Sequence, residues 1–127
     1  MNTPQGDLLD ELRWTVTTFG TCAKSSTPDA WFPPEPPLWA TPRANEPVDV
    51  LTAQWEKDAR AEYEEFAQAL CKGCPVQAEC LELALREEET LPRSEIHGVS
   101  GAAAPWQRWQ MRRNRRRAAQ RAGKAAA

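Results

Sequence analysis

Four cysteines constrain the folding of this 127-residue chain more than any other feature of its sequence. Three of them lie within CKGCPVQAEC, residues 71–80, and the fourth, Cys22, lies far upstream, which gives the spacing C-x48-C-x2-C-x5-C. A chain this small buries proportionally little surface, so we expect its fold to depend on what these thiols bind. Four sulfurs can form two disulfides, hold a zinc ion, hold an iron–sulfur cluster or include a redox pair.

The positions of Cys71, Cys74 and Cys80 favour an iron–sulfur cluster. Gly73 lets the backbone turn tightly between the first two, and an all-cysteine cluster accepts three neighbouring thiolates and a separate one such as Cys22. A structural zinc site usually has two short ligand pairs, a thioredoxin-like C-x-x-C needs a βαβ setting, and disulfides are rare in a reducing cytosol. On spacing alone, zinc and a redox or disulfide role remain open.

The N-terminal sequence MNTPQGDLLDELRW has acidic residues where a secretory signal has a basic region and an apolar stretch. No run in the chain approaches the ~20 apolar residues that a membrane span needs. We therefore expect a cytoplasmic protein with no membrane partner. We also expect neither enzymatic turnover nor a small-molecule substrate.

Hydrophobic periodicity predicts an all-α fold with long irregular segments. The clearest helical pattern runs from about residue 49 to 70, with Asp49 as its N-cap. Its residues recur at spacings of three and four, at Leu51, Trp55, Ala59, Tyr63 or Glu62, Phe66 and Leu70. The other expected helices are a short one over residues 7–14, one with Cys74 near its cap and Pro75 in its first turn that ends before Pro92, and one from about Pro105 into the arginines.

Charge divides the chain into an acidic body and a basic end. All 18 acidic residues lie at or before Glu95, whereas residues 106–127 carry eight basic residues and no acidic one. Residues 1–105 carry the other eight basic residues and so have a net charge of −10. We expect an N-terminal arm over residues 1–18, a cysteine-bearing domain over 19–104 with a Pro-rich loop at 33–48, and a basic C-terminal helix or tail over 105–127. Such a division is typical of a protein with two kinds of partner.

The arginines of this basic end are candidate DNA contacts. We single out Arg112, Arg113, Arg115, Arg116, Arg117 and Arg121. Together they cover most of a helix circumference, which is unfavourable for packing and suits contacts to phosphate. We expect them to position DNA rather than to read its bases, and the alternative is a tail that only increases solubility.

Three stretches resemble the WhiB-like family of actinobacterial and actinophage regulators. The stretch ALCKGCPVQAECLELAL resembles the family signature of one cysteine followed by C-x2-C-P-V/I-x4-C-x3-A-L. PDAWFPP is similar to the family's acidic-aromatic-Phe stretch, and HGVSGAAAPWQRWQMRRNRRR is similar to its Gly-Val-Trp-Gly-Gly turn followed by a basic helix. The resemblance covers about residues 19–117 in the correct order.

This resemblance implies a [4Fe–4S] cluster held by Cys22, Cys71, Cys74 and Cys80 in a small helical fold. It also implies a response to oxygen or nitric oxide, binding to the C-terminal, promoter-reading domain of the primary sigma factor of RNA polymerase, and contact with DNA through the basic tail. The candidate sigma-factor contacts are Trp31, Phe32, Gly98, Val99, Gly101 and Trp106. Trp31 and Phe32 either face this partner or pack under the Pro-rich segment.

The chain departs from the family pattern in the turn, where Ser100-Gly101-Ala102 stands for Trp-Gly-Gly. Gly98 and Gly101 keep the turn itself, and Trp106 or Trp109 is the candidate substitute for the missing indole. Two other classes of function remain as alternatives. One is a thiol–disulfide reductase in which the cluster-free protein cycles Cys71 and Cys74, and the other is a zinc-stabilised DNA-binding module.

Overall fold

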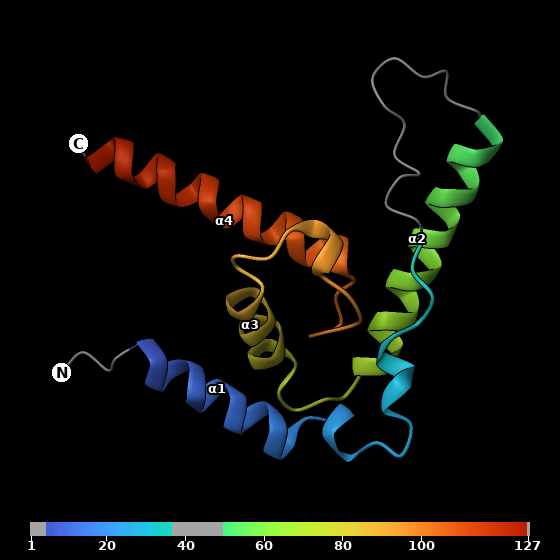
Figure 1. Cartoon of the computed structure of the whole chain (residues 1–127), viewed down its shortest axis with the longest axis horizontal. Coiled ribbons are helices and arrows are strands. Elements are labelled where there is room, and N and C mark those ends of the chain that lie inside the picture. The colour runs from blue at the N-terminus through green and yellow to red at the C-terminus, as the bar shows by residue number, and fades with distance from the viewer. Residues whose placement is uncertain (1–4, 37–49, 127) are drawn as a thin grey trace.

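The structure, a computed structural model, is built of helices joined by irregular segments (Figure 1). It describes residues 5–36 and 50–126, and the side chains of residues 8–36 and 56–125. The helices are α1 (Gln5–Phe19), α2 (Val50–Cys71), α3 (Gln77–Glu87) and α4 (Pro105–Ala126), and the short 3₁₀ turns are η1 (Cys22–Lys24), η2 (Pro28–Trp31) and η4 (Arg93–Glu95). The predicted all-α class is confirmed. Most of the expected Pro-rich loop and the expected N-cap Asp49 lie outside the described residues.

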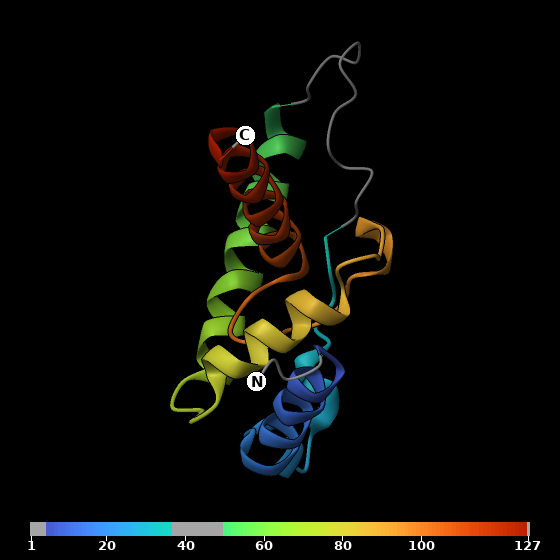
Figure 2. The same cartoon turned by 90° about the vertical axis from the view of Figure 1, so that its left-hand side faces the viewer.

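Helix α3 lies between α1 and α4 and contacts both of them (Figures 1 and 2). Arg13 of α1 extends its Nε to within 3.3 Å of Glu87 Oε1 at the end of α3. Helix α1 is longer than the predicted stretch of residues 7–14, because docking on α3 stabilises turns whose intrinsic helix propensity is modest. The N-terminal segment is therefore packed against the body through this helix.

Helix α2 matches the predicted range and presents Tyr63, Ala67 and Cys71 to the core. These positions are spaced by four residues, so they lie on one face of the helix. The prediction that Phe66 belongs to this buried row is wrong, since 43% of its surface is exposed. Trp106, at the start of α4, packs against this buried face of α2. Its ring contacts that of Tyr63, with the ring centroids 4.9 Å apart. Helix α2 is thereby joined to α4.

Helix α3 begins at Gln77, with Val76 as its N-cap, so the prediction that it begins around Cys74 and Pro75 is wrong. A tight turn precedes it, in which the Cys74 N–H donates to the Cys71 carbonyl at 3.1 Å and Gly73 has φ +78°. Only glycine adopts this left-handed conformation without strain. The turn separates Cys74 from the helix and gives it a position of its own.

A second turn, over residues 98–103, lies against α3 and is called the closing turn below. Ser100 and Ala103 exchange two backbone hydrogen bonds, of 3.2 and 3.0 Å. Gly101 lies so close to α3 that a Cβ atom placed on it would be 2.4 Å from Leu81 Cβ. Its neighbour Ala102 has φ +63°, which is strained for a residue with a side chain. This turn therefore packs directly on the helix that carries Cys80.

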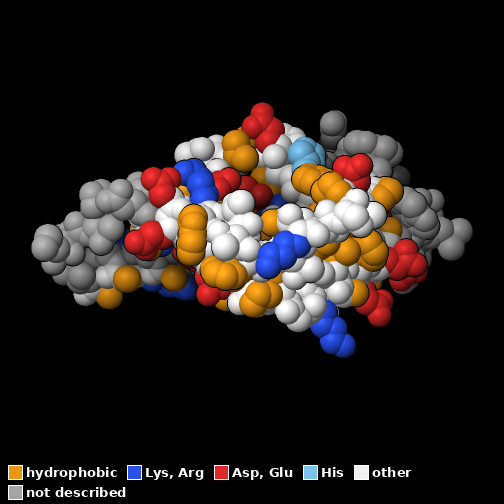
Figure 3. Space-filling model, turned by 90° about the horizontal axis from the view of Figure 1, so that it is seen from below, with side chains coloured by type: hydrophobic (Ala, Val, Ile, Leu, Met, Phe, Trp, Pro, Cys, Tyr) orange, Lys and Arg blue, Asp and Glu red, His pale blue; other side chains and the backbone are white. Residues whose placement is uncertain are grey.

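The buried apolar core is small. Its described members are Tyr63, Ala67, Cys71, Val76, Leu85, Ile96, Val99, Ala103 and Ala104. Several larger hydrophobic side chains are exposed instead, among them Trp14 and Phe19 of α1, whose rings meet edge to face. Figure 3 shows hydrophobic side chains along the face seen from below Figure 1, on the side where α1 lies.

Candidate metal centre

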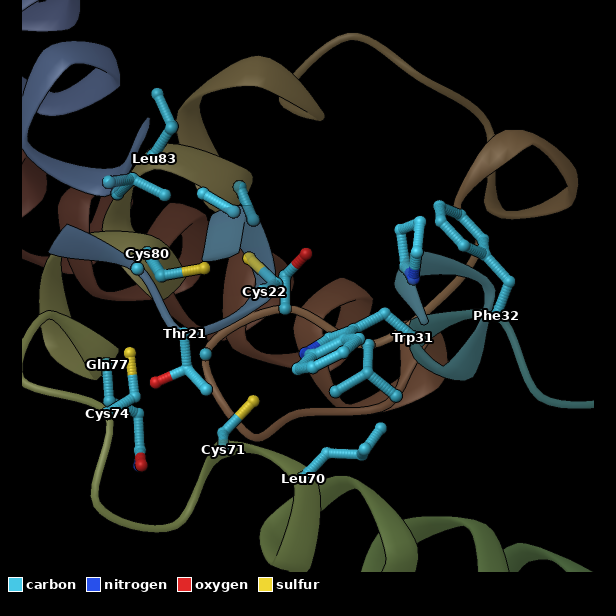
Figure 4. A pocket seen from close by; sticks show the side chains of 18 of the residues that line it. Thr21, Cys22, Trp31, Phe32, Leu70, Cys71, Cys74, Gln77, Cys80 and Leu83 are labelled. Atoms are coloured by element: carbon cyan, nitrogen blue, oxygen red, sulfur yellow. The ribbon is translucent and has the colours of Figure 1, made fainter. Parts of the chain in front are cut away.

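The four cysteines line a single cavity of about 430 Å³ (Figure 4). Each comes from a different local structure: Cys22 from η1, Cys71 from the end of α2, Cys74 from the turn that follows, and Cys80 from α3. All four are free thiols, and the turn at residues 98–103 closes one side of the cavity through Val99, Ser100 and Gly101. The structure thus brings Cys22 to the three clustered cysteines across 48 intervening residues.

The four sulfurs lie around the cavity and do not converge on a position that one metal ion could occupy. In the described ranges, no three His, Cys, Asp or Glu side chains form a group that could share one metal ion. Figure 4 shows the four sulfurs spread around the cavity, with Thr21 between them and Trp31 and Leu70 on one side. The cavity is therefore large compared with a single ion. Besides the four cysteine sulfurs, the carboxylates of Glu87 and Glu88 also line it, but these are paired with Arg13 and Arg108.

Backbone N–H groups of the closing turn donate to two of the sulfurs. Burial raises the pKa of the Cys71 thiol, although the Ala102 N–H and the Trp31 indole both donate to it and oppose that effect. Burial also raises the pKa of the Cys80 thiol, and negative charge on the other three sulfurs raises it further. The Gly101 N–H donates to the Cys80 sulfur and lowers this pKa, but it does not cancel the effect of burial. The turn is therefore part of the wall that faces the thiols.

Cys74 behaves differently from these two. Burial opposes its ionisation, but the N–H groups of Thr21 and Val76 and the Thr21 hydroxyl donate to its sulfur, so the pKa of Cys74 lies below its usual value. The Val76 N–H is one of the unpaired donors at the start of α3. Thr21 comes from the segment that also carries Cys22, so two distant parts of the chain donate hydrogen bonds to one sulfur.

This arrangement suits a cationic inorganic centre. Neighbouring thiolates raise each other's pKa, and a bound metal centre removes that penalty because a coordinating thiol is deprotonated outright. Four cysteine sulfurs form the ligand set of common iron–sulfur clusters and also of structural zinc sites. The residues present therefore fit a [4Fe–4S] cluster by ligand type, by number and by the hydrogen-bond donors around the sulfurs.

A buried arginine fixes the closing turn to the rest of the body. Arg108 is 1% exposed, and its Nε and Nη2 donate to the Glu88 carboxylate at 2.9 and 3.0 Å. Its Nη1 donates to the carbonyls of Gly98 and Ala103, each at 2.8 Å, and its Nη2 also donates to that of His97 at 2.9 Å. Glu88 itself lines the cavity. One side chain thus joins the turn, the end of α3 and the start of α4.

Half of the cations on α4 face the body. This inner row consists of Arg108, Arg112, Arg115 and Arg116. Arg112 and Arg116 donate to main-chain carbonyls just beyond the end of α3, and Arg115 pairs with Glu82. The prediction that these arginines cover the helix without packing is therefore wrong for Arg112, which is only 8% exposed. Arg115 and Arg116 remain exposed, although both bond to the body.

The remaining cations of α4 form an outer row of Arg113, Arg117, Arg121 and Lys124. Their spacings of four, four and three residues place them on one face of the helix. Arg117, Arg121 and Lys124 are exposed, and the Arg113 guanidinium lies 4.7 Å from the centre of the Trp109 ring. This face points away from the contacts that the inner row makes.

The candidate sigma-factor contacts occupy two kinds of position. Gly98, Val99 and Gly101 are buried, while Trp31 and Trp106 are half-buried in packing around the core. Phe32 differs from them because 67% of its surface is exposed at the rim of the cavity. The structure therefore leaves Phe32 as the exposed member of the set.

Sequence reasoning missed Glu88, Thr21 and Arg108. Glu88 sits in the run REEE, which reads as a solvated helix face, and Thr21 precedes a cysteine with no motif of its own. A usable signal was the spacing of the inner row, because Arg108, Arg112, Arg115 and Arg116 recur at four, three and one residues and so share one helix face. Such a row beside an acidic helix indicates docking.

Comparison with protein families gives one result that covers most of the chain. Residues 17–118 match the family model described as Transcription factor WhiB. Comparisons with curated proteins and with solved structures gave no match. Among the described residues, no helix is both long and apolar enough to cross a membrane. Because the matched region contains the four cysteines, the closing turn and most of α4, the chain belongs to the WhiB family of transcription factors.

Proposed function

We propose that this transcriptional regulator binds a [4Fe–4S] cluster through Cys22, Cys71, Cys74 and Cys80 and performs no enzymatic turnover. The observation that carries the proposal is that four free thiols from four local structures line one cavity. When bound, such a cluster supplies a centre that reacts with oxygen or nitric oxide and accepts or gives up an electron. The chain's own residues hold the thiolates, exclude water with the apolar wall and donate hydrogen bonds to the sulfurs.

Anaerobic purification tests the cofactor. We expect a brown protein with four iron and four sulfide per chain, as the cluster formula requires, and with visible charge-transfer absorption. A colourless protein that contains zinc would instead support the zinc-stabilised module. Insulin reduction by the cluster-free protein, abolished by Cys71→Ser or Cys74→Ser, would support the thiol–disulfide reductase.

The proposed protein partner is the C-terminal domain of the primary sigma factor. The exposed ring of Phe32 lies at the rim of the cysteine cavity, next to the closing turn. An exposed aromatic side chain beside a well-ordered site is a typical anchor of a protein interface. A pull-down with the sigma domain, performed with and without the cluster, tests this. We expect Phe32→Ala to weaken capture, and Phe66→Ala, which removes an exposed phenylalanine from α2, to leave it unchanged.

The proposed DNA contact is the outer row of α4. The inner row is engaged with α3 and the closing turn, so Arg112 is left out of the proposed contacts and Arg115 and Arg116 are secondary. Arg113, Arg117, Arg121 and Lys124 present four cations along one helix face, a pattern that suits successive phosphates. An acidic body repels DNA, so this row must supply the attraction.

A further inference from the structure

Trp31 is held against the cysteine cavity by both its main chain and its side chain. Its carbonyl accepts the Val99 N–H at 2.7 Å, which ties the end of η2 to the closing turn. Its indole packs against the buried core that contains Cys71 and Val99. Figure 4 shows the nitrogen-bearing edge of the indole turned toward the cysteines, with Phe32 on the opposite side. The orientation of the ring is therefore determined by contacts on two sides.

The nitrogen-bearing edge of the indole is turned toward the cysteines (Figure 4), and the ring packs on the core that contains Cys71. Hydrogen bonding from this indole and from the Ala102 main chain accordingly opposes the effect of burial, which raises the pKa of the Cys71 thiol. The second donor is a backbone group, so no substitution removes it cleanly. The first is a side-chain donor that a substitution removes, because phenylalanine keeps a smaller aromatic ring and lacks the N–H. Trp31 thus offers a direct way to change one hydrogen bond at one candidate ligand.

A hydrogen bond to a ligating thiolate affects the redox properties of an iron–sulfur cluster. The bond withdraws electron density from the sulfur, and it strengthens when the cluster carries one more negative charge, since charge-assisted hydrogen bonds are the stronger ones. Hydrogen bonds to the sulfurs are accordingly among the factors that set cluster potentials. A donor that favours the more negative form raises the reduction potential.

We propose that Trp31 is a tuning residue of the cofactor site, whose indole N–H holds the Cys71 thiolate and raises the reduction potential of the bound cluster. The inference rests on the proposed function and deepens it. The change it concerns is the uptake of one electron by the cluster from an external reductant, with no bond made or broken and no proton transferred. It also moves Trp31 from the candidate sigma-factor surface to the cavity wall.

The test compares Trp31→Phe with the wild-type protein by mediated spectroelectrochemistry under anaerobic conditions. We expect an unchanged content of iron and sulfide and a reduction potential shifted to more negative values. The matched control is Trp106→Phe, which removes another indole N–H from the same protein, one that donates to Glu64 Oε1 at 2.7 Å and not to a cysteine. This control should leave the potential at its wild-type value.

A second variant separates the N–H from the ring shape. Incorporation of β-(3-benzothienyl)alanine at position 31 replaces the indole N–H by sulfur at nearly unchanged shape, and it should shift the potential in the same direction as Trp31→Phe. A cluster with wild-type potential in this variant would overturn the inference alone. Loss of the cluster in this variant would assign the N–H to cluster retention and would also overturn the inference as stated. A wild-type protein that binds no iron or sulfide would overturn the proposed function and this inference together.

Discussion

The cysteine cavity and the outer half of α4 are held in place in very different ways. The cavity draws its walls from η1, η2, the end of α2, α3 and the closing turn, and hydrogen bonds from several of them converge on the sulfurs. Residues 114–125 of α4, by contrast, are all exposed. A metal centre requires ligands at fixed positions, whereas attraction to phosphate requires only cations on one face.

Helix α4 contains both situations in one element. Its first turns carry Arg108 and Arg112, which are buried and bonded to the body, and its later turns carry the exposed end of the outer row. The identity of a residue therefore says little about its role here, because arginine is a structural residue at one end of the helix and a candidate phosphate contact at the other. Substitutions that separate these roles test the comparison.

The largest effect is expected at the cysteines. Replacing any one of Cys22, Cys71, Cys74 or Cys80 by serine should abolish stable cluster binding, because a four-iron cluster with three thiolates becomes labile. Iron and acid-labile sulfide per chain measure the outcome. Lys72→Ala, an exposed change between Cys71 and Cys74, should keep the full cluster content. A single serine variant that keeps all its iron and sulfide would remove that cysteine from the ligand set.

The next effect concerns the buried pair that joins the cavity to α4. Arg108→Met should lower the free energy of unfolding by about 3–5 kcal/mol, because it leaves the largely buried Glu88 carboxylate without its partner. The control is Arg13→Met, which breaks the exposed pair with the adjacent Glu87 and should cost less than about 1 kcal/mol. Denaturant unfolding of the two variants measures both. Equal losses of unfolding free energy in the two variants would show that the buried pair of Arg108 and Glu88 stabilises the fold no more than the exposed pair does.

The outer row should govern the salt dependence of DNA binding. The triple variant Arg113→Gln, Arg117→Gln, Arg121→Gln should reduce the slope of log affinity against log salt by about 2.7 units, at about 0.9 per phosphate contact. Loss of affinity should be similar for unrelated DNA sequences, since phosphates carry no sequence information.

The matched change on the inner row is the double variant Arg115→Gln, Arg116→Gln, whose cations already contact α3 or the segment that follows it. It should change the salt slope by less than about 1 unit. Titrations at several salt concentrations compare the variants. A larger slope change for the inner pair would reverse the assignment of the two rows, and a loss confined to one promoter would indicate base readout.

The smallest effect is expected inside the cavity wall. Ala102→Gly should raise the free energy of unfolding by about 0.5–1 kcal/mol, because φ +63° costs alanine more than the added chain entropy costs glycine. The adjacent Gly101→Ala should destabilise instead, since its Cβ would overlap Leu81. Thermal unfolding of both variants checks the opposite signs. Destabilisation by Ala102→Gly would show that the strained conformation is not maintained in solution.

The sequence predicted the elements that follow a regular pattern. The spacing of Tyr63 and Leu70 gave the range of α2 to within one residue at each end, and the helix over the arginines was placed correctly at Pro105. Both predictions succeeded because periodicity and a proline at the first helical position are local signals. The all-α class followed from them.

Positions that depend on distant partners could not be predicted in this way. Pro75 suits a first helical turn, yet α3 starts two residues later because the preceding turn orients Cys74 toward Thr21. In the sequence, the inner row of arginines cannot be told from a solvated tail, because its docking on α3 is a tertiary contact. Glu88 likewise cannot be told from a surface glutamate, because only the fold pairs it with Arg108. These roles are set by tertiary contacts, which outweigh local preference.

The anchoring of α4 at its first turns also makes the helix a lever arm. Lys124 lies 12 residues beyond Arg112, or about 18 Å at 1.5 Å per residue. A tilt of about 10° at the anchor would move that end by about 3 Å, close to the 3.4 Å rise of one base pair. The hydrogen bonds of Arg108 and Arg112 therefore determine where the distant cations of α4 lie relative to the phosphates of a DNA strand. A small shift in the wall of the cysteine cavity would produce a larger displacement at the far end of the helix.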